Sequence, residues 1–414
     1  MSRSTALQKK ALQKPAFEKR TVRDVDVTGK RVFLRADLNV PLDDGRITDD
    51  TRIRASLPTI RYLLERGASV ILASHLGRPK GKVNDALRLK PVADRLSQLL
   101  GRSVRMTGDA LGPGVHDAIG KLRPGELILL ENLRFHGEEE ANDPKFAKAL
   151  ADLADLYVDD AFGSAHRAHA STEGITHFLH SVAGLLLERE VESLSRLLEK
   201  PPRPFHTVIG GAKISGKLEV LDALLARCQA ILVGGGMANT FLAARGLGLG
   251  KSLVETEQID NARRIVAEAR RKRVRLMLPT DVVAAAQVHY RAQHQVVAID
   301  EVPKDWVVVD IGPQTVAAYT EHLAKARTIF WNGPMGIFEI EPFADGTNAM
   351  ARFLAERSAA GVITIVGGGD SVAAVDRLGL TDRMTHVSTG GGASLEFVEG
   401  RTLPGVAALD DPEE

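Results

Sequence analysis

Residues 57–79 read LPTIRYLLERGASVILASHLGRP, and this stretch contains the repeating unit from which the fold is built. Its first part has apolar residues at helical spacing, and 69–76 is a short apolar run typical of a buried strand. A glycine and a proline then form a tight turn that presents His75 and Arg78. This order predicts a helix and a strand of a parallel sheet, with functional side chains where the strand ends.

Short apolar runs alternate with helical patterns along the whole chain. Parallel strands that are covered by helices on both faces read as such continuous runs. The alternation predicts an α/β protein with two doubly wound parallel-sheet (Rossmann-like) domains joined by a hinge helix. The runs that we expect to be strands are 30–38, 69–76, 126–133, 155–162, 206–211, 230–236, 274–279, 306–313, 328–334, 362–369 and 386–392.

The clearest domain boundary is a charged amphipathic run from Glu188 to Lys200, which a proline-rich exit follows. This pattern indicates a helix between the domains. We expect residues 1–16, which are basic, to be a flexible extension; a transit peptide is the alternative, and a secretory apolar core is absent. The predicted division is 1–187 for an N-terminal domain, 188–204 for the inter-domain helix and linker, 205–395 for a C-terminal domain, and 396–414 for a segment that returns to the N-terminal domain.

The composition limits the classes of partner. The 414 residues are 44% hydrophobic with a net charge of +1, so two cores can form and no global field attracts nucleic acid or anionic lipid. The single cysteine, Cys228, excludes an internal disulfide and fits a reducing compartment. No apolar run approaches the ~18 residues of a membrane span. We therefore expect a cytoplasmic protein that binds neither nucleic acid nor membrane.

Basic side chains gather where the predicted strands of the first half end. Polar residues at these positions are wasteful unless they meet a ligand, and the arginine fork matches phosphate and carboxylate geometry. A small, multiply charged anion such as a phosphorylated carboxylic acid is therefore the expected ligand. The candidates are Asp37 and Asn39, which share one face of the first strand with Arg35, then Arg52, His75, Arg78 and Arg134, and, from DAFGSAHRAHAS at 160–171, His166, Arg167 and His169.

The same basic residues also fit roles that involve no anion. His166 and His169 are candidate metal ligands with Asp159 or Asp160, although Arg167 between them would repel a metal ion. If each strand end is considered without the others, its basic residue is explained equally well as an ordinary surface arginine or as part of an Arg–Asp ion pair. Nucleic acid is a weaker alternative, because aromatic residues for stacking are scarce.

Four glycine clusters follow apolar runs in the second half. Glycine lets backbone amides approach phosphate oxygens, and helix N-termini add their dipole. Within the cluster at 209–217, residues 211–217 fit the first seven positions of a Walker A loop, but Leu218 replaces the required Ser or Thr. Lys213 and Lys217 would repel each other at a helix start unless an anion lay between them. The other clusters are 233–240, 366–371 and 388–396.

Asp370 directly follows three glycines and is the candidate Mg²⁺ ligand, because Mg²⁺ prefers a carboxylate together with substrate phosphates. An N-cap for the helix that follows is an equally good role for it on local grounds. In WNGPMGIFEIE, at 331–341, Asn332 and Glu339 are candidates for bonds to a nucleotide base or ribose. A structural turn accounts for the Gly-Pro pair of this stretch equally well.

The chain contains, in this order, RADLNVP, SHLGRP, LLENLRF, DAFGSAHRAHAS, GGAKISGK, GGGMA, WNGPMGIFE, GGGDS and HVSTGGGASLE. Each motif alone is modest, but nine in register over two domains are highly specific. Together they give the chain, from about Arg23 to Val406, a resemblance to the phosphoglycerate kinase family. The resemblance implies reversible phosphoryl transfer between 1,3-bisphosphoglycerate and ADP, which gives 3-phosphoglycerate and ATP in glycolysis and gluconeogenesis.

The resemblance also implies where each ligand binds. It places the acid substrate on the N-terminal domain and ADP or ATP with Mg²⁺ on the C-terminal domain of a monomer. In-line phosphoryl transfer needs positioned cations and little covalent help, so we assign no acid–base residue. Hinge closure near 188–200 would exclude water.

Carried over position by position, the resemblance gives three groups of site residues. The acid-substrate group is Asp37, Asn39, Arg52, His75, Arg78, Arg134 and Arg167, with His166 and His169 as electrostatic support. The nucleotide group is Gly211, Lys217, Asn332, Glu339, Gly368, Gly369, Asp370 and Ser371, with Asp370 as the metal ligand. The catalytic group that holds the transferring phosphoryl is Arg52, Lys213, Gly391 and Gly392.

Three positions depart from the family pattern. Ala36 and Leu38 are smaller than expected but should face away from the ligand, and Gly216 is expected to loosen a helix start. A silent binder of the two ligands is a competing hypothesis, which the retention of Arg52 and Lys213 disfavours. A dinucleotide dehydrogenase is disfavoured because no Gly-x-Gly-x-x-Gly follows any strand.

Overall fold

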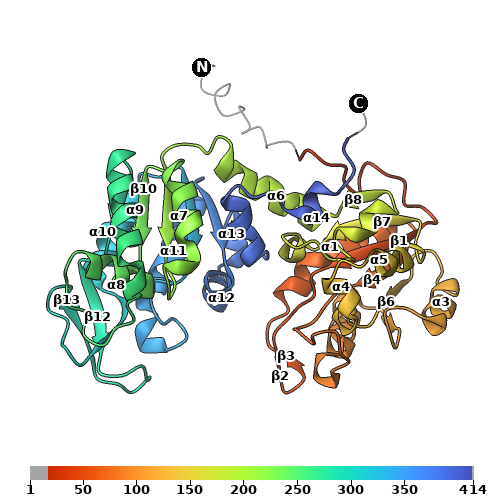
Figure 1. Cartoon of the computed structure of the whole chain (residues 1–414), viewed down its shortest axis with the longest axis horizontal. Coiled ribbons are helices and arrows are strands. Elements are labelled where there is room, and N and C mark those ends of the chain that lie inside the picture. The colour runs from red at the N-terminus through yellow and green to blue at the C-terminus, as the bar shows by residue number, and fades with distance from the viewer. Residues whose placement is uncertain (1–16, 413–414) are drawn as a thin grey trace, which may run out of the picture. The chain divides into compact units, whose positions relative to one another are not determined.

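The computed structural model describes residues 17–412, so the predicted flexible extension at 1–16 lies outside the described residues. Helices and strands alternate along the described chain as the sequence predicts, and the fold is α/β (Figure 1). None of the helices in this part combines the length and the apolarity that crossing a lipid bilayer requires.

The chain divides into two compact units. The first unit runs to Glu192 and resumes at Thr402, and the second unit is the chain between these points. The first division point lies inside α6 (Leu185–Leu198), so this helix belongs to both units. The second division point follows α13 (Gly392–Val398), so the structural C-terminal segment starts later than the 396–414 proposed from the sequence.

The first unit is built on a sheet of six parallel strands in the order β5-β6-β4-β1-β7-β8. Neighbouring strands are separated along the chain by crossover connections, most of which contain helices (Figure 1). The strands are β1 (Arg31–Ala36), β4 (Ser69–Ala73), β5 (Arg105–Met106), β6 (Leu127–Leu129), β7 (Leu156–Asp160) and β8 (Ser181–Ala183). The helices are α1 (Thr51–Glu65), α2 (Lys90–Leu100), α3 (Pro113–Gly120), α4 (Gly137–Glu140), α5 (Pro144–Ala151) and α14 (Pro404–Ala407), and a small hairpin comprises β2 (Leu42–Asp43) and β3 (Arg46–Ile47).

These strands end earlier than the apolar runs that predict them. β1 ends at Ala36, so Asp37 and Asn39 lie in the loop beyond the strand and do not share a strand face with Arg35. Arg134 likewise lies in a 3-10 turn beyond β6. The loops after the strands, and not the strands themselves, therefore carry most of the predicted acid-substrate residues.

The second unit has its own six-stranded parallel sheet, in the order β11-β10-β9-β15-β16-β17. Its strands are β9 (Phe205–Ile209), β10 (Ala230–Val233), β11 (Arg275–Met277), β15 (Thr328–Asn332), β16 (Ile363–Gly367) and β17 (His386–Val387). Its helices, besides α13, are α7 (Leu218–Leu225), α8 (Gly235–Ala244), α9 (Ile259–Arg271), α10 (Pro313–Leu323), α11 (Asp345–Ala359) and α12 (Gly369–Arg377).

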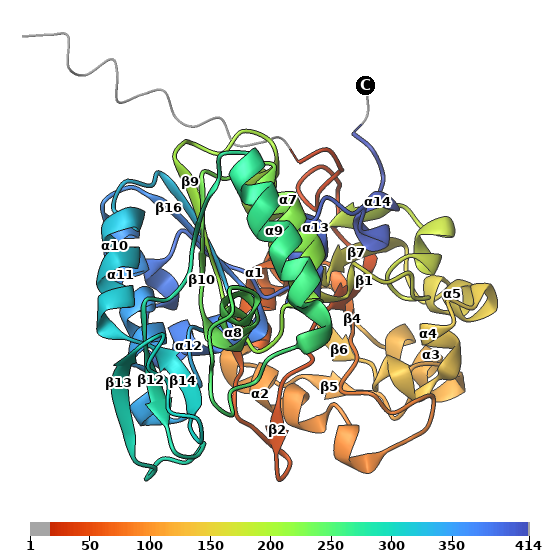
Figure 2. The same cartoon turned by 60° about the vertical axis from the view of Figure 1, so that its left-hand side comes forward.

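A small antiparallel sheet in the second unit corrects one prediction. The run 306–313 was expected in a parallel sheet, but its strand β14 (Val307–Ile311) pairs antiparallel with β12 (Asp281–Ala285). β12 pairs antiparallel in turn with β13 (His294–Ala298), and Figure 2 shows the three strands together. A continuous apolar run indicates burial but not the direction of the neighbouring strand, so the sequence did not reveal this sheet.

Each unit has a separate apolar core. In the first unit, Leu34, Val70 and Val158 from three adjacent strands are completely buried. In the second, Trp331 and Met350 are completely buried in one cluster. Because these strands bury both faces, a charged side chain inside a strand needs a specific polar partner.

Candidate active site

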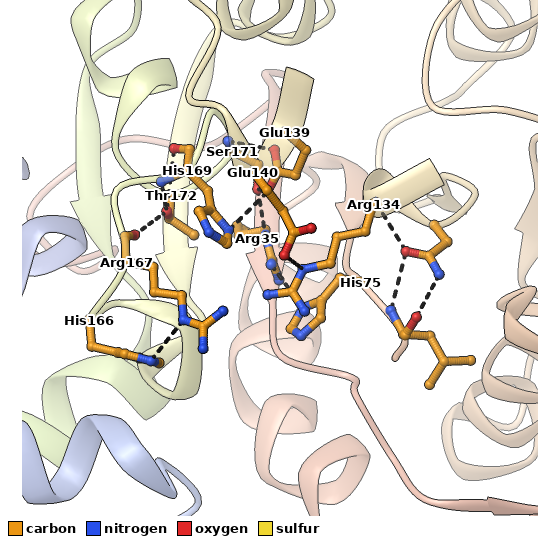
Figure 3. Close-up of polar contacts among 12 residues, drawn as sticks. Arg35, His75, Arg134, Glu139, Glu140, His166, Arg167, His169, Ser171 and Thr172 are labelled. Atoms are coloured by element: carbon orange, nitrogen blue, oxygen red, sulfur yellow. Dashed lines mark hydrogen bonds and ion pairs between the residues drawn. The ribbon is translucent and has the colours of Figure 1, made fainter. Parts of the chain in front are cut away.

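Arg35 lies at the centre of a buried polar cluster in the first unit (Figure 3). Its Nε donates to Oγ of Ser171 at 2.9 Å, and its Nη2 lies 3.0 Å from Nδ1 of His75. Its Nη1 donates to the backbone oxygen of Ala36. A buried guanidinium is tolerated only when its donors are paired, and here all three nitrogens have a partner.

Glu139, from α4, places a negative charge on the other side of Ser171. Its two carboxylate oxygens accept from the Ser171 amide at 3.0 Å and from the Ser171 hydroxyl at 2.5 Å. Burial raises the pKa of Glu139, and the charge of Arg35 and the two bonds from Ser171 oppose that rise. Glu139 is 21 residues before the basic stretch at 160–171, so the sequence does not show that the fold brings this carboxylate to it.

Burial and the neighbouring arginines disfavour a positive charge on His75 and on His169. Burial holds the pKa of His75 well below its ordinary value, and the positive charge of Arg35 lowers it further. Burial, and then Arg134, lowers the pKa of His169 to about 3. Because burial and the neighbouring arginines disfavour a second proton on this ring, electrostatic support from His169 would come from its dipole and hydrogen bonds and not from a positive charge.

Arg52 and Asp37 form an ion pair at the start of α1. Nη1 of Arg52 lies 3.0 Å from both carboxylate oxygens of Asp37 and donates to the backbone oxygen of Asn39 at 3.3 Å. The side-chain oxygen of Asn39 accepts from the Gly77 amide at 2.8 Å. Arg52 lies in the first helical turn, as predicted, and Asp37 compensates for the unfavourable helix dipole there.

Arg134 completes the buried part of the cluster. Its Nη1 donates to the Gly77 backbone oxygen at 3.1 Å, and its Nε has no hydrogen-bond partner and lies 3.5 Å from Oε1 of Glu140. Burial and the charge of Arg35 lower the pKa of Arg134. An incompletely paired, partly desolvated guanidinium favours binding of an anion.

Five of the seven predicted acid-substrate residues are linked by hydrogen bonds or lie against the buried cluster, and Arg167 lies near enough for its charge to lower the pKa of Arg134. The five are Asp37, Asn39, Arg52, His75 and Arg134. Arg78 and Arg167 are exposed, and Nε of Arg167 donates to Nε2 of His166 at 3.1 Å. Both arginines lie on loops that follow strands of the same sheet, β4 and β7.

A cavity of about 280 Å³ lies in the second unit beside the glycine clusters. Its wall is mostly apolar, as expected for a site that accepts a planar base. The predicted residues Gly211, Glu339 and Asp370 line it, together with Leu242, Leu253, Val282, Val308, Ile311 and Met335.

Lys217 lies next to this cavity and is held by Asn332. Its Nζ donates to the backbone oxygen of Asn332 at 3.2 Å and to the side-chain oxygen of the same residue. Burial lowers the pKa of Lys217 to about 8, and the carboxylate of Asp370 opposes this change. The amide nitrogen of Asn332 donates to the Gly367 backbone oxygen at 2.8 Å, so Asn332 holds the lysine and a glycine turn in register.

The positions of Lys213, Lys217 and Asp370 differ from what the sequence predicts. Lys217 is turned toward Asn332 and Lys213 is exposed, so no bound anion is needed to separate them. Asp370 lies in the first turn of α12 without capping it through its side chain, and the N-cap is Gly368, with φ of 91°. The N-cap role for Asp370 is therefore wrong, and its carboxylate is exposed.

The remaining nucleotide-side residues shape the backbone. Ser371 is buried, and its Oγ accepts from the Gly333 amide. Gly369 is the first residue of α12. Gly391 and Gly392 form the N-terminus of α13, with Gly391 as the N-cap at φ of 54°, so their amides lie at a positive helix end.

Glu255 is a second carboxylate that the sequence did not single out. It accepts from the Ile214 amide at 2.6 Å, the Ser215 amide at 3.1 Å and the Ser215 hydroxyl at 2.5 Å. These bonds fix the turn between Lys213 and Lys217. Glu255 accepts hydrogen bonds from the amide and hydroxyl of Ser215, as Glu139 does from those of Ser171. No local sequence motif predicts either contact.

Asp370 fits a role as a Mg²⁺ ligand. Within residues 17–412 no three His, Cys, Asp or Glu side chains form a cluster able to hold a metal ion, so the alternative at His166 and His169 gains no support. Mg²⁺ needs only one or two protein carboxylates when substrate phosphates provide further ligands. An exposed carboxylate that lines the cavity beside Lys217 meets this requirement.

Replacing Gly333 by alanine is expected to raise the nucleotide KM about ten- to a hundredfold. Gly333 has φ of 92°, and an added Cβ would lie 2.2 Å from the Gly210 backbone oxygen and 2.7 Å from Nζ of Lys217. The lysine would be displaced from Asn332. Steady-state kinetics at varied ATP measure the effect, with Gly248→Ala, where a Cβ meets open space, as the control. Equal KM values in the two variants would contradict the placement of Lys217.

Comparison with known proteins agrees with this geometry. The family model described as phosphoglycerate kinase matches residues 22–401. The chain is 58% identical over 400 residues to the phosphoglycerate kinase of Chloroflexus aggregans, covering 96% of this chain and 100% of that protein. It is 54% identical over 393 residues to that of Pelotomaculum thermopropionicum, covering 95% and 99%.

Solved structures give the same result. The phosphoglycerate kinase structure from Coxiella burnetii superposes with a TM-score of 0.83 at 44% identity, covering 94% of this chain and 98% of that one. The enzyme from Pyrococcus horikoshii gives 0.85 at 35% identity with the same coverage. By sequence and by fold, this chain belongs to the phosphoglycerate kinase family.

Proposed function

We propose that this chain catalyses reversible phosphoryl transfer between 1,3-bisphosphoglycerate and ADP, giving 3-phosphoglycerate and ATP, the glycolytic reaction for which its family is named. The proposal rests on the observation that each unit contains one site, and that the two sites suit different ligands. One unit has a largely buried cluster of Arg35, Arg52 and Arg134, suited to a phosphorylated carboxylate. The other has an apolar cavity with Lys217 beside it, suited to a nucleotide.

The acid substrate binds through hydrogen bonds and charge on the first unit. Arg134 is held by the Gly77 backbone oxygen and Asn39 by the Gly77 amide, so both are oriented before the ligand arrives. Nε of Arg134 makes no hydrogen bond to residues 17–412 and faces Glu140 at 3.5 Å, which leaves it able to donate to an anion. Pre-organised donors lose little conformational entropy on binding. The residues to which we give this role are Asp37, Asn39, Arg52, His75, Arg78, Arg134 and Arg167.

The nucleotide binds on the second unit, with its base in the apolar cavity. Lys217 and the glycine turns approach the phosphates, and Glu339 lies where it can accept from the ribose. Asp370 would hold Mg²⁺, which, when bound, neutralises the phosphate charge that opposes transfer. The residues to which we give this role are Gly211, Lys217, Asn332, Glu339, Gly368, Gly369, Asp370 and Ser371.

The transferring phosphoryl group is held by cations and backbone amides, namely Arg52, Lys213 and the amides of Gly391 and Gly392. An acyl phosphate has a carboxylate leaving group, so the protein supplies no general acid or base. The two ligands must share a water-free space during transfer, and we propose that the units close about α6 in each turnover. We further propose that the enzyme is a cytoplasmic monomer that binds neither nucleic acid nor membrane.

The experiment that tests this function is Mg²⁺- and ATP-dependent phosphorylation of 3-phosphoglycerate, coupled to reductive removal of the acyl phosphate. We expect turnover that requires all three components. Calorimetric binding of both ligands without turnover would favour the silent-binder alternative. Turnover with another phosphate acceptor in place of 3-phosphoglycerate would replace the proposed substrate.

A further inference from the structure

Four buried side chains form a continuous hydrogen-bonded chain in the first unit: Glu139, Ser171, Arg35 and His75 (Figure 3). The Ser171 hydroxyl donates to Glu139 at 2.5 Å and accepts from Nε of Arg35 at 2.9 Å. Nη2 of Arg35 lies 3.0 Å from Nδ1 of His75. The chain joins α4, the loop after β7, β1 and the loop after β4, which are far apart in sequence.

The chemistry of the chain determines the direction of every bond in it. A guanidinium has donors only, so Nδ1 of His75 accepts from Arg35 and carries no proton. A neutral imidazole then has its single proton on Nε2. The serine hydroxyl is also oriented, because its hydrogen is committed to Glu139 and its lone pair to Arg35.

Burial and the surrounding charges keep this imidazole neutral. Burial disfavours a positive ring at His75 most, and the charges of Arg35 from β1, Arg134 from the loop after β6 and Arg52 from α1 add to this effect. The ring of His169, from the loop after β7, would add to it only if it were itself protonated. Nε2 has no hydrogen-bond partner among residues 17–412, so its proton is available to a ligand.

We propose that Glu139 and Ser171 are positioning residues that act through Arg35 to hold His75 as the neutral Nε2–H tautomer, ready to donate one hydrogen bond to the acid substrate. The identity of that substrate rests on the function proposed above, but the tautomer does not. Glu139 touches no ligand in this scheme and acts only through Ser171 and Arg35.

Replacing either Ser171 or Glu139 is expected to remove the preference of the His75 imidazole for the Nε2–H tautomer. In Ser171→Ala, Nε of Arg35 loses its acceptor, and the guanidinium is no longer fixed against His75. In Glu139→Gln, the buried negative charge next to Arg35 is lost, and an amide NH₂ faces one of the two Ser171 donors. In both variants His75 is expected to populate both neutral tautomers.

The test is a long-range ¹H–¹⁵N correlation spectrum of ligand-free protein with ¹⁵N-labelled histidine. The resonances of His75 are assigned by comparison with His75→Asn. In the wild type at neutral pH, we expect Nδ1 to show the shift of an unprotonated nitrogen and Nε2 that of a protonated one. In Ser171→Ala and Glu139→Gln, we expect the two shifts to move toward each other.

Kinetics supply the second readout. We expect the KM for 3-phosphoglycerate to rise about tenfold in both variants, as for one lost hydrogen bond, with the KM for ATP unchanged. Glu138→Gln is the matched control, because Glu138 lies on the same short helix and is exposed. Glu139→Asp, which keeps the charge, should recover part of the loss.

Two results would overturn the proposal. One is a wild-type spectrum in which His75 is protonated on Nδ1, and this result would leave the proposed kinase reaction intact. The other is a Ser171→Ala protein with wild-type nitrogen shifts and an unchanged KM. If Glu139→Gln does not fold, Ser171→Ala alone decides, since it keeps the buried Glu139 and Arg35 charges.

Discussion

Replacing Lys213 by alanine is expected to lower kcat about 10²–10³-fold and to change both KM values by less than about threefold. Lys213 is exposed and makes no hydrogen bond or ion pair within residues 17–412, and its charge acts on Glu255 more weakly than the hydrogen bonds from Ser215 and Ile214 do. Glu255 fixes the neighbouring turn through the amides of Ile214 and Ser215, and these bonds survive the substitution. The loss therefore reports on charge that develops in the transition state.

The coupled assay at varied concentrations of both substrates measures this split between kcat and KM. Lys251→Ala is the control, because Lys251 is an exposed lysine of the same unit that has no proposed role. A raised nucleotide KM with wild-type kcat would make Lys213 a binding residue and would contradict its proposed part in transfer.

The kinetic effect of Arg52→Ala is expected to be less specific than that of Lys213→Ala, although the sequence assigns both residues to the group that holds the transferring phosphoryl. Arg52 also neutralises Asp37 at 3.0 Å. Its removal leaves a buried carboxylate without its partner at the acid-substrate site, and we therefore expect Arg52→Ala to raise the KM for 3-phosphoglycerate as well as lower kcat. For this reason Lys213 is the better probe of the transferring group.

Replacing Asp159 by asparagine is expected to stabilise the protein at alkaline pH relative to the wild type. Asp159 is completely buried, one of its oxygens has no partner, and burial raises its pKa from 3.8 to about 7. A carboxyl whose folded pKa is raised stabilises the fold when it is protonated, and this stabilisation is lost as the pH rises through about 7. An asparagine at this position does not titrate.

The difference in unfolding free energy between Asp159→Asn and the wild type should therefore move in favour of the variant by roughly 3 kcal/mol between about pH 5 and about pH 8. Urea unfolding followed by circular dichroism at several pH values measures it. Asp155→Asn is the control, because Arg31 lowers the pKa of Asp155 and the contribution of this group is already complete at about pH 5. A pH-independent difference for Asp159→Asn would show that the buried carboxyl does not titrate in this range.

Much of the fold follows from the apolar pattern. The run at 69–76 predicts β4, and its turn predicts that His75 lies at the end of the strand. Parallel strands have to be apolar on both faces, so they are easily recognised. The small sheet of β12, β13 and β14 is less visible, because β13 is largely exposed and carries no continuous apolar run.

The residue types of the site can also be predicted from the sequence, but their protonation states and tertiary contacts cannot. Arginines and glycine clusters at strand ends predict where anions bind. The neutrality of His169 depends on burial and on Arg134, which no local pattern reveals. Glu139 and Glu255 reach their serines through tertiary contacts, so the sequence offers only one signal for the network: an arginine inside the apolar strand RVFLRA.

In the proposed reaction the phosphoryl group passes directly and in line between the two substrates, held by cations and amides, with no protein group bonded to it. The most direct test uses adenosine thiotriphosphate that is chiral at the γ-phosphorus, with 3-phosphoglycerate as acceptor and analysis of the configuration of the product. One in-line transfer predicts inversion at phosphorus. Retention would require an even number of displacements, hence a phosphorylated side chain, and would contradict the account.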